Sequence, residues 1–134
     1  MDLLEYQGKQ LFARHGVPVP SGSPATTVEE AVAADDEIGY PCVIKAQVQI
    51  GGRGKAGGIK VANDRRAADH HARAILGMDI RGHTVHEVWV EAASDIAAEY
   101  YASIVFDEGP DSVLLDNLNV TTFAAEGRWY GPGA

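Results

Sequence analysis

The chain has 134 residues and a mass of 14.3 kDa, which suffices for one domain of modest size. Its apolar content of 46% excludes disorder over the whole length, and no apolar run approaches the roughly 18 residues that a membrane span needs. The net charge of −8 disfavours nucleic acid and anionic membranes as partners, and the single cysteine excludes an internal disulfide. Since no signal peptide is visible, we expect a cytoplasmic protein.

The first segment predicts a helix near the N-terminus. Asp2 and Glu5 have the spacing of a capping box, and Leu4, Leu11 and Phe12 recur at helical period. A glycine and two prolines follow at positions 16 to 20, and they end the pattern. We therefore expect a short helix with one apolar face.

Two further segments predict helices with clear start signals. Thr27 and Glu30 have capping-box spacing before an apolar-periodic run that ends near Gly39. Asn63 or Asp64 caps a third helix, which a glycine closes after about residue 76.

The segment 42–62 predicts a β-hairpin. Residues 44, 46, 48 and 50 are apolar while 45, 47 and 49 are polar, which is the alternation of a strand, and residues 59–62 alternate again. Between them lies GGRGKAGG (51–58), a loop in which five of eight residues are glycine. Segments 86–91 and 99–106 predict two more strands, joined by a turn or helical bend at 92–98, and 112–115 an edge strand. Helices and an antiparallel hairpin together indicate an α+β class with a mixed sheet.

The glycine-rich loop does not belong to two familiar phosphate-binding motifs. The glycines of 52–57 match the dinucleotide fingerprint, but that fingerprint opens a helix, whereas a strand follows here. A Walker A loop is excluded because Ala56 replaces its serine or threonine and Gln49 its first glycine. Two interpretations stay open: a flap whose amides, Arg53 and Lys55 hold phosphate, or a mobile tip with solvated charges.

Lys45 is the sharpest candidate for a ligand-binding side chain. It lies in mid-strand, on the face opposite the apolar residues, where an ammonium group can contact a phosphate. The alternative is an exposed strand lysine.

Further polar candidates lie at a strand end and across the next turn: Glu91, Ser94 and Glu99. Acids at such positions hydrogen-bond a base or ribose, or they cap the chain. His70 and His71 are adjacent on a helix and do not face one metal site. A buried strand is expected around Cys42, and nothing resembles a Ser-His-Asp set.

Three blocks of sequence resemble the β subunit of succinyl-CoA synthetase, a succinate–CoA ligase. They are DLLEYQGKQLF (2–12), VIKAQVQIGGRGKAGG (43–58) and VEAASDIAAE (90–99), within a resemblance that covers about residues 1–107. The resemblance implies the N-terminal subdomain of an ATP-grasp fold, with flanking helices and a glycine-rich hairpin flap. It also implies binding of ATP/ADP or GTP/GDP in the citric acid cycle reaction that joins succinate and coenzyme A, with a phosphohistidine on the partner α subunit.

Carried over position by position, the resemblance implies seven nucleotide contacts. Lys45 would contact phosphate, and residues 52–54 would form the covering flap. Glu91 and Ser94 would lie near the base and Glu99 near the ribose hydroxyls. The set carried over is Lys45, Gly52, Arg53, Gly54, Glu91, Ser94 and Glu99.

Departures from the family pattern limit what the chain does alone. Family members are nearly three times longer, and the asparagine and aspartate that hold magnesium lie in the part without a counterpart here. Residues 1–107 are therefore interpreted as a partial ATP-grasp domain and 108–134 as a divergent tail. Three functions stay open: a ligase portion without turnover of its own, a non-catalytic module that binds a purine nucleotide or associates with a ligase α subunit or intact β subunit, or an inactive relic of the ligase gene.

Overall fold

The computed structural model describes residues 3–98, 105–106 and 113–114. By its contacts the chain divides into two units, Met1–Ser94 and Asp95–Ala134. In the second unit, β7 (Val105–Phe106) pairs antiparallel with β8 (Val113–Leu114), where strands were expected at 99–106 and 112–115. The rest of those two segments, and Glu99, lie outside the described residues. None of the described helices is long and apolar enough to cross a membrane.

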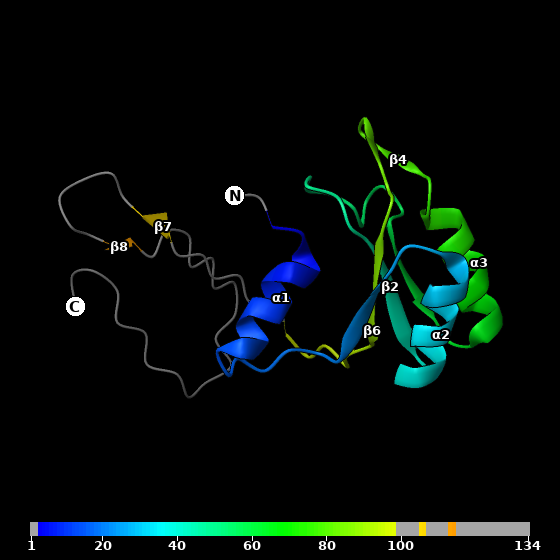
Figure 1. Ribbon diagram of the computed structural model, residues 1–134, viewed down its shortest axis with the longest axis horizontal. Coiled ribbons are helices and arrows are strands. Elements are labelled where there is room, and N and C mark those ends of the chain that lie inside the picture. Colours follow the sequence, from blue (N-terminus) through cyan, green and yellow to red (C-terminus); the bar gives the residue numbers. More distant parts are fainter. Residues whose placement is uncertain (1–2, 99–104, 107–112, 115–134) are drawn as a thin grey trace. The chain divides into compact units, whose positions relative to one another are not determined.

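The first unit is built on a four-stranded sheet in the order β1-β6-β2-β3 (Figure 1). All three pairings within it are antiparallel. The predicted hairpin is confirmed, although its first strand stops four residues earlier than the alternation suggests. The strands are β1 (Gly22–Ala25), β2 (Cys42–Ala46), β3 (Ile59–Ala62) and β6 (Val88–Ala92), with a small separate pair β4 (Asp79–Ile80) and β5 (His83–Thr84).

Two helices cover the apolar face of this sheet. The α2 helix (Val28–Ile38) begins at Thr27, whose hydroxyl accepts a hydrogen bond from the Glu30 amide at 3.1 Å, so the predicted capping box is confirmed. The α3 helix (Arg65–Ile75) begins at Asp64, which accepts from the Ala67 amide at 2.8 Å. Cys42 lies fully buried in this core, as expected.

The core contains one polar side chain whose burial opposes its ionisation. Asp35 of α2 is fully buried, and within the described residues neither of its carboxyl oxygens has a hydrogen-bond partner. Burial raises the pKa of Asp35 and outweighs the opposing effect of the neighbouring Cys42 thiol.

The α1 helix (Glu5–Arg14) does not pack as the sequence suggests. It has no buried residue, and the side chains of Leu11 and Phe12 are 42% and 55% exposed. Its cap also differs: the helix begins after Leu4, whose amide donates to the Gln7 side chain at 2.9 Å, rather than at an Asp2–Glu5 box. The predicted helix is confirmed, but the sheet surface in front of α1 is charged, so the helix meets it with Glu5 and Lys9.

Tight packing of Trp89 on β1 makes Gly22 necessary. A β-carbon built on Gly22 would lie 2.3 Å from the indole ring of Trp89 and 2.6 Å from the Val90 carbonyl oxygen. Such distances require the strand or the ring to move. The absent side chain therefore fixes where the indole lies on the sheet.

We expect Gly22→Ala to lower the free energy of unfolding by about 1–3 kcal/mol, because the added methyl group overpacks this contact. Gly8→Ala is the matched control: nothing lies within 4 Å of its β-carbon position, so relief of a helical glycine should raise stability by roughly 0.5–1 kcal/mol. Urea unfolding followed by circular dichroism measures both. Equal stabilities of Gly22→Ala and the parent would contradict the packing argument.

Candidate functional site

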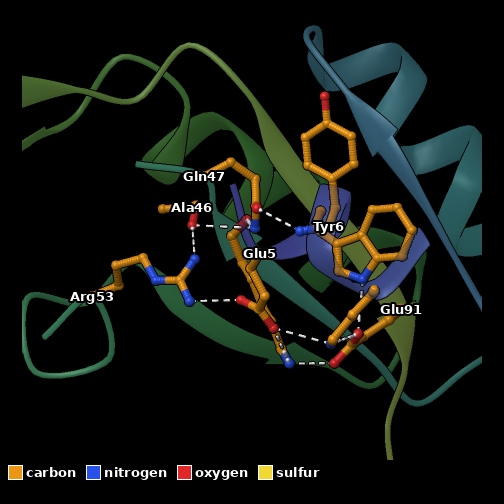
Figure 2. A network of polar contacts seen from close by, with 9 residues as sticks. Glu5, Tyr6, Ala46, Gln47, Arg53 and Glu91 are labelled. Carbon is orange, nitrogen blue, oxygen red and sulfur yellow. Dashed lines mark hydrogen bonds and ion pairs between the residues drawn. The ribbon is translucent and has the colours of Figure 1, made fainter. Parts of the chain in front are cut away.

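The polar face of the sheet carries a network of charged side chains (Figure 2). The register places Lys45 opposite Trp89 and Val43 opposite Glu91, so these side chains share the face that α2 and α3 do not cover. The first turns of α1 lie over this face and add Glu5 and Lys9. As the strand alternation predicts, Lys45 lies on the face opposite the buried Ile44 and Ala46.

Lys45 and Glu91 form the centre of this network. The Lys45 ammonium group pairs closely with Glu91 Oε1 and lies 3.5 Å from Glu5 Oε1. Glu91 Oε2 pairs with Lys9 and accepts a hydrogen bond from the Trp89 indole at 2.7 Å. The Glu91 side chain is only 6% exposed, so it needs these partners to stay ionised.

Glu5 joins the sheet to the glycine-rich loop. Its Oε2 lies 2.6 Å from the Arg53 guanidinium, and its Oε1 lies 3.0 Å from Lys9. Arg53 also donates to the Ala46 carbonyl oxygen at 2.9 Å. The loop is thereby tied at Arg53 both to the end of β2 and to the first turn of α1.

The pKa values follow from this pairing. Burial alone would raise the pKa of Glu5, but the hydrogen bond from Lys9 and the charges of Lys45 and Arg53 lower it to about 2. Burial likewise opposes ionisation of Glu91, and the hydrogen bonds from Lys45, Lys9 and Trp89 lower its pKa. The pKa of Lys9 is raised, since its two carboxylate partners outweigh burial. Both carboxylates are therefore ionised at neutral pH.

Aromatic and amide contacts complete the attachment of α1. The rings of Tyr6 and Trp89 stack with centroids 5.7 Å apart and planes inclined by 12°. The Tyr6 amide donates to the Gln47 side chain at 3.3 Å, and Gln47 in turn donates to the Lys45 carbonyl at 3.2 Å (Figure 2). The helix is thus held on the sheet by polar and stacking contacts.

A cavity of about 730 Å³ opens beside this network. The loop 51–55 lines it, and so does Glu5, which belongs to the network. Gly52 has a φ of +85°, a backbone conformation that favours glycine, and the loop curls back through a hydrogen bond from the Gly58 amide to the Arg53 carbonyl. The cavity, which is large enough for a small-molecule ligand, is therefore bordered by glycine backbone amides and by the side chains of Arg53 and Lys55.

The structure brings most of the sequence-predicted residues together. Lys45 and Glu91 are in contact, Arg53 joins them through Glu5, and Gly52 and Gly54 line the cavity with Arg53. Lys45 itself contacts Glu5 but is not among the residues that line the cavity. Ser94 is exposed beyond the end of β6, and Glu99 lies outside the described residues.

Four residues of this site were not predicted from the sequence: Glu5, Lys9, Tyr6 and Trp89. One signal was available, because Glu5 and Lys9 are four residues apart in the predicted helix and so share a face. Nothing in the sequence says that this charged face, rather than the apolar one, meets the sheet.

Comparison with known proteins identifies the family. A family model described as "ATP-grasp domain" matches residues 2–115. The chain belongs to the ATP-grasp family. It is 52% identical over 115 residues to the succinate–CoA ligase [ADP-forming] subunit beta of Halorubrum lacusprofundi, which confirms the resemblance found in the sequence. The match covers 86% of this chain but 30% of that relative, so the chain spans less than a third of the relative's length.

Solved structures agree on the ATP-grasp fold. An acetyl-coenzyme A synthetase of Candidatus Korarchaeum cryptofilum, in complex with coenzyme A and Ca-AMPCP, superposes with a TM-score of 0.72 at 24% identity, over 80% of this ATP-grasp chain and 49% of that one. ACD1 of the same organism, in complex with coenzyme A, gives 0.70 at 26% identity, over 80% and 48%. The PH1788 protein of Pyrococcus horikoshii gives 0.66 at 24% identity, over 80% and 48%.

Membership of the ATP-grasp family implies nucleotide binding, and a magnesium ion commonly accompanies such a nucleotide. In the part of the chain that the structure describes, no group of three or more histidine, cysteine or acidic side chains is placed to hold a metal ion. Glu5 and Glu91 are occupied by cationic partners. The described residues therefore do not fit a metal site of their own.

The lowered pKa of Glu5 predicts that the network fails in acid. A group with a folded-state pKa of about 2 and an ordinary value of 4.5 stabilises the fold fully above about pH 4.5, and this contribution disappears as the pH falls through 2. We expect Glu5→Gln to lower the free energy of unfolding by about 1–2 kcal/mol at neutral pH, allowing for solvent screening, and to lose less stability than the parent in acid.

Urea unfolding between pH 2 and 7 measures this difference. Glu37→Gln is the control, since it removes the same charge from an exposed position on α2. Its stability should follow that of the parent across the range. Parallel curves for the parent and Glu5→Gln would show that the network does not hold Glu5 ionised.

Proposed function

We propose that this chain is the nucleotide-binding portion of a cytoplasmic succinate–CoA ligase β subunit, with ATP/ADP or GTP/GDP as its ligand. The identity of 52% to such a subunit supports the assignment. The observation that most supports it is a pair of contacts at one residue. Lys45 of the sheet and Arg53 of the glycine-rich loop both contact the carboxylate of Glu5, which lines a nucleotide-sized cavity. Two cations from separate elements suit the oxygens of one polyphosphate.

Each predicted side chain has a role in this proposal. Lys45 contacts a phosphate as a point charge, and Arg53 offers a planar fork of donors from the loop. Gly52 and Gly54 bring backbone amides close to phosphate oxygens. The family resemblance assigns Glu91 and Ser94 to the base and Glu99 to the ribose hydroxyls. The positive φ at Gly52 and the cavity lined by residues 51–55 support the part assigned to the loop.

The proposed ligand is bound weakly by the chain alone. ATP-grasp proteins enclose the nucleotide between two subdomains, and this chain spans 49% or less of each of the three solved structures compared above. With one subdomain, much of the nucleotide remains in water, and its base and ribose lose contacts that burial would strengthen. The phosphate contacts then supply most of the affinity.

The overall reaction of such a ligase converts succinyl-CoA, ADP or GDP, and phosphate into succinate, coenzyme A, and ATP or GTP. Magnesium would supply charge neutralisation at the transferring phosphoryl group. Since the described residues hold no group of three or more metal-ligating side chains, the part they contribute is phosphate binding and a covering loop. Chemistry requires further chain, such as a ligase α subunit or an intact β subunit.

Loss of Lys45 should weaken nucleotide binding. We expect Lys45→Met to reduce the affinity for ADP at least about tenfold, because a charge-assisted contact is removed. Isothermal titration of the purified chain measures it, with circular dichroism to verify folding. Lys60→Met is the matched control, since Lys60 is exposed on β3 and belongs to no part of the network. Unchanged affinity in Lys45→Met would remove Lys45 from the site.

The isolated chain should bind nucleotide without turnover. We expect no steady thioester formation when the purified protein is supplied with succinate, coenzyme A, magnesium and ATP, because in-line phosphoryl transfer needs groups that the described residues lack. A coupled assay of ADP release measures it. Sustained turnover by the chain alone would refute this prediction, and failure to bind ADP would favour the relic over both the ligase portion and the binding module.

A further inference from the structure

Glu5 contacts both cations that the proposed function assigns to phosphate. One carboxylate oxygen lies 2.6 Å from Arg53, and the other lies 3.5 Å from Lys45 and 3.0 Å from Lys9. Lys45 belongs to a strand and Arg53 to the loop, so the carboxylate bridges two elements that a polyphosphate would also bridge. Glu5 itself lines the cavity.

The charge balance leaves little attraction for a second anion. Three cations, Lys9, Lys45 and Arg53, face two carboxylates, Glu5 and Glu91, so the network as described carries a net charge of +1. An incoming phosphate would bring at least one further negative charge to within contact distance of Glu5. Either the carboxylate moves away from the two cations or the phosphate is repelled.

We propose that Glu5 is a positioning residue that stands in for a phosphate group, holding Lys45 and Arg53 together until a polyphosphate displaces it. This inference rests on the proposed nucleotide function. The contact between Glu5 and Arg53 ties down the loop while no ligand is bound. Displacement frees Arg53 to follow the ligand, with the Ala46 carbonyl as its remaining partner.

The helix provides a place for the displaced carboxylate. Lys9 is one turn further along α1 and already lies 3.0 Å from Glu5. Because the two residues are four apart on the same helix, their ion pair survives when α1 shifts as a unit or when the Glu5 side chain turns. Glu5 can therefore leave Lys45 and Arg53 without becoming an unpaired charge.

The test is the direction in which affinity changes. Isothermal titrations with ADP and with inorganic tripolyphosphate, both without metal, compare the parent with Glu5→Gln. We expect Glu5→Gln to bind both ligands about threefold to tenfold more tightly, since the competing charge is gone. A residue with a purely structural role would weaken binding when replaced, so the sign separates the two roles.

Asp79→Asn is the matched control for charge. Asp79 is an exposed acid on β4, accepts a hydrogen bond from the Gly82 amide at 2.9 Å, and belongs to no part of the network. Its loop lies beside the flap, because a β-carbon on Gly52 would be 3.5 Å from the Arg81 guanidinium. We expect Asp79→Asn to change either affinity less than about twofold. A gain equal to that of Glu5→Gln would overturn the specific role of Glu5.

The two ligands separate the failure of this inference from that of the proposed function. If the parent binds ADP and Glu5→Gln binds it equally or more weakly, the inference is overturned while the proposed function stands. If Glu5→Gln gains affinity for tripolyphosphate but no variant binds ADP, Glu5 acts as inferred and the nucleotide function is overturned. If no variant binds either ligand, both are overturned.

Discussion

The attachment of α1 to the open face of the sheet is the interaction on which the candidate site depends. No residue of the helix is fully buried, and Leu11 and Phe12 are exposed, so hydrophobic burial contributes little to its position. Its place is set by Glu5 and Lys9, which pair with Lys45, Arg53 and Glu91, and by the stacking of Tyr6 on Trp89. In partly buried ion pairs, the Coulombic attraction is little larger than the free energy lost on desolvation. Such pairs still fix the relative position of the two side chains, because each charge needs its partner. The network thus sets the position of the helix more than it adds stability.

This arrangement gives the two faces of one sheet different physical roles. On one face, Ile44, Val88 and Val90 pack against α2 and α3 and exclude water. On the other, strand alternation presents Lys45 and Glu91 one residue away from that core. Packing on the apolar face holds the strands rigidly in place. The side chains on the polar face are positioned as a consequence, because they belong to the same strands. A binding site built this way uses a sheet to aim its charges and a glycine-rich loop to cover them.

Local signals predicted the parts of the fold that local physics determines. The Thr27–Glu30 cap and the glycine-rich hairpin were readable because each depends on residues close in sequence. The strand Gly22–Ala25 was not, since four residues including a proline and a glycine carry no alternation, and only pairing with β6 makes them a strand. The orientation of α1 could not be predicted for a similar reason: the face that meets the sheet is decided by charges 40 and 82 residues away.

The same distinction explains what could be predicted of the site. Strand alternation placed Lys45 on the polar face, and glycine content identified the loop, but neither reveals that Glu5 and Glu91 already pair with the cations. A lysine identified from strand alternation alone would be regarded as unpaired and able to bind a ligand. Here its attraction for an anion is the difference between two competing interactions, one with the chain's own carboxylates and one with phosphate. A polyphosphate can win that competition because it meets Lys45 and Arg53 with several charges at once, whereas Glu5 offers one. Lys9 lowers the free-energy cost of moving Glu5 away from Lys45 and Arg53, because it remains as an ion-pair partner for the displaced carboxylate.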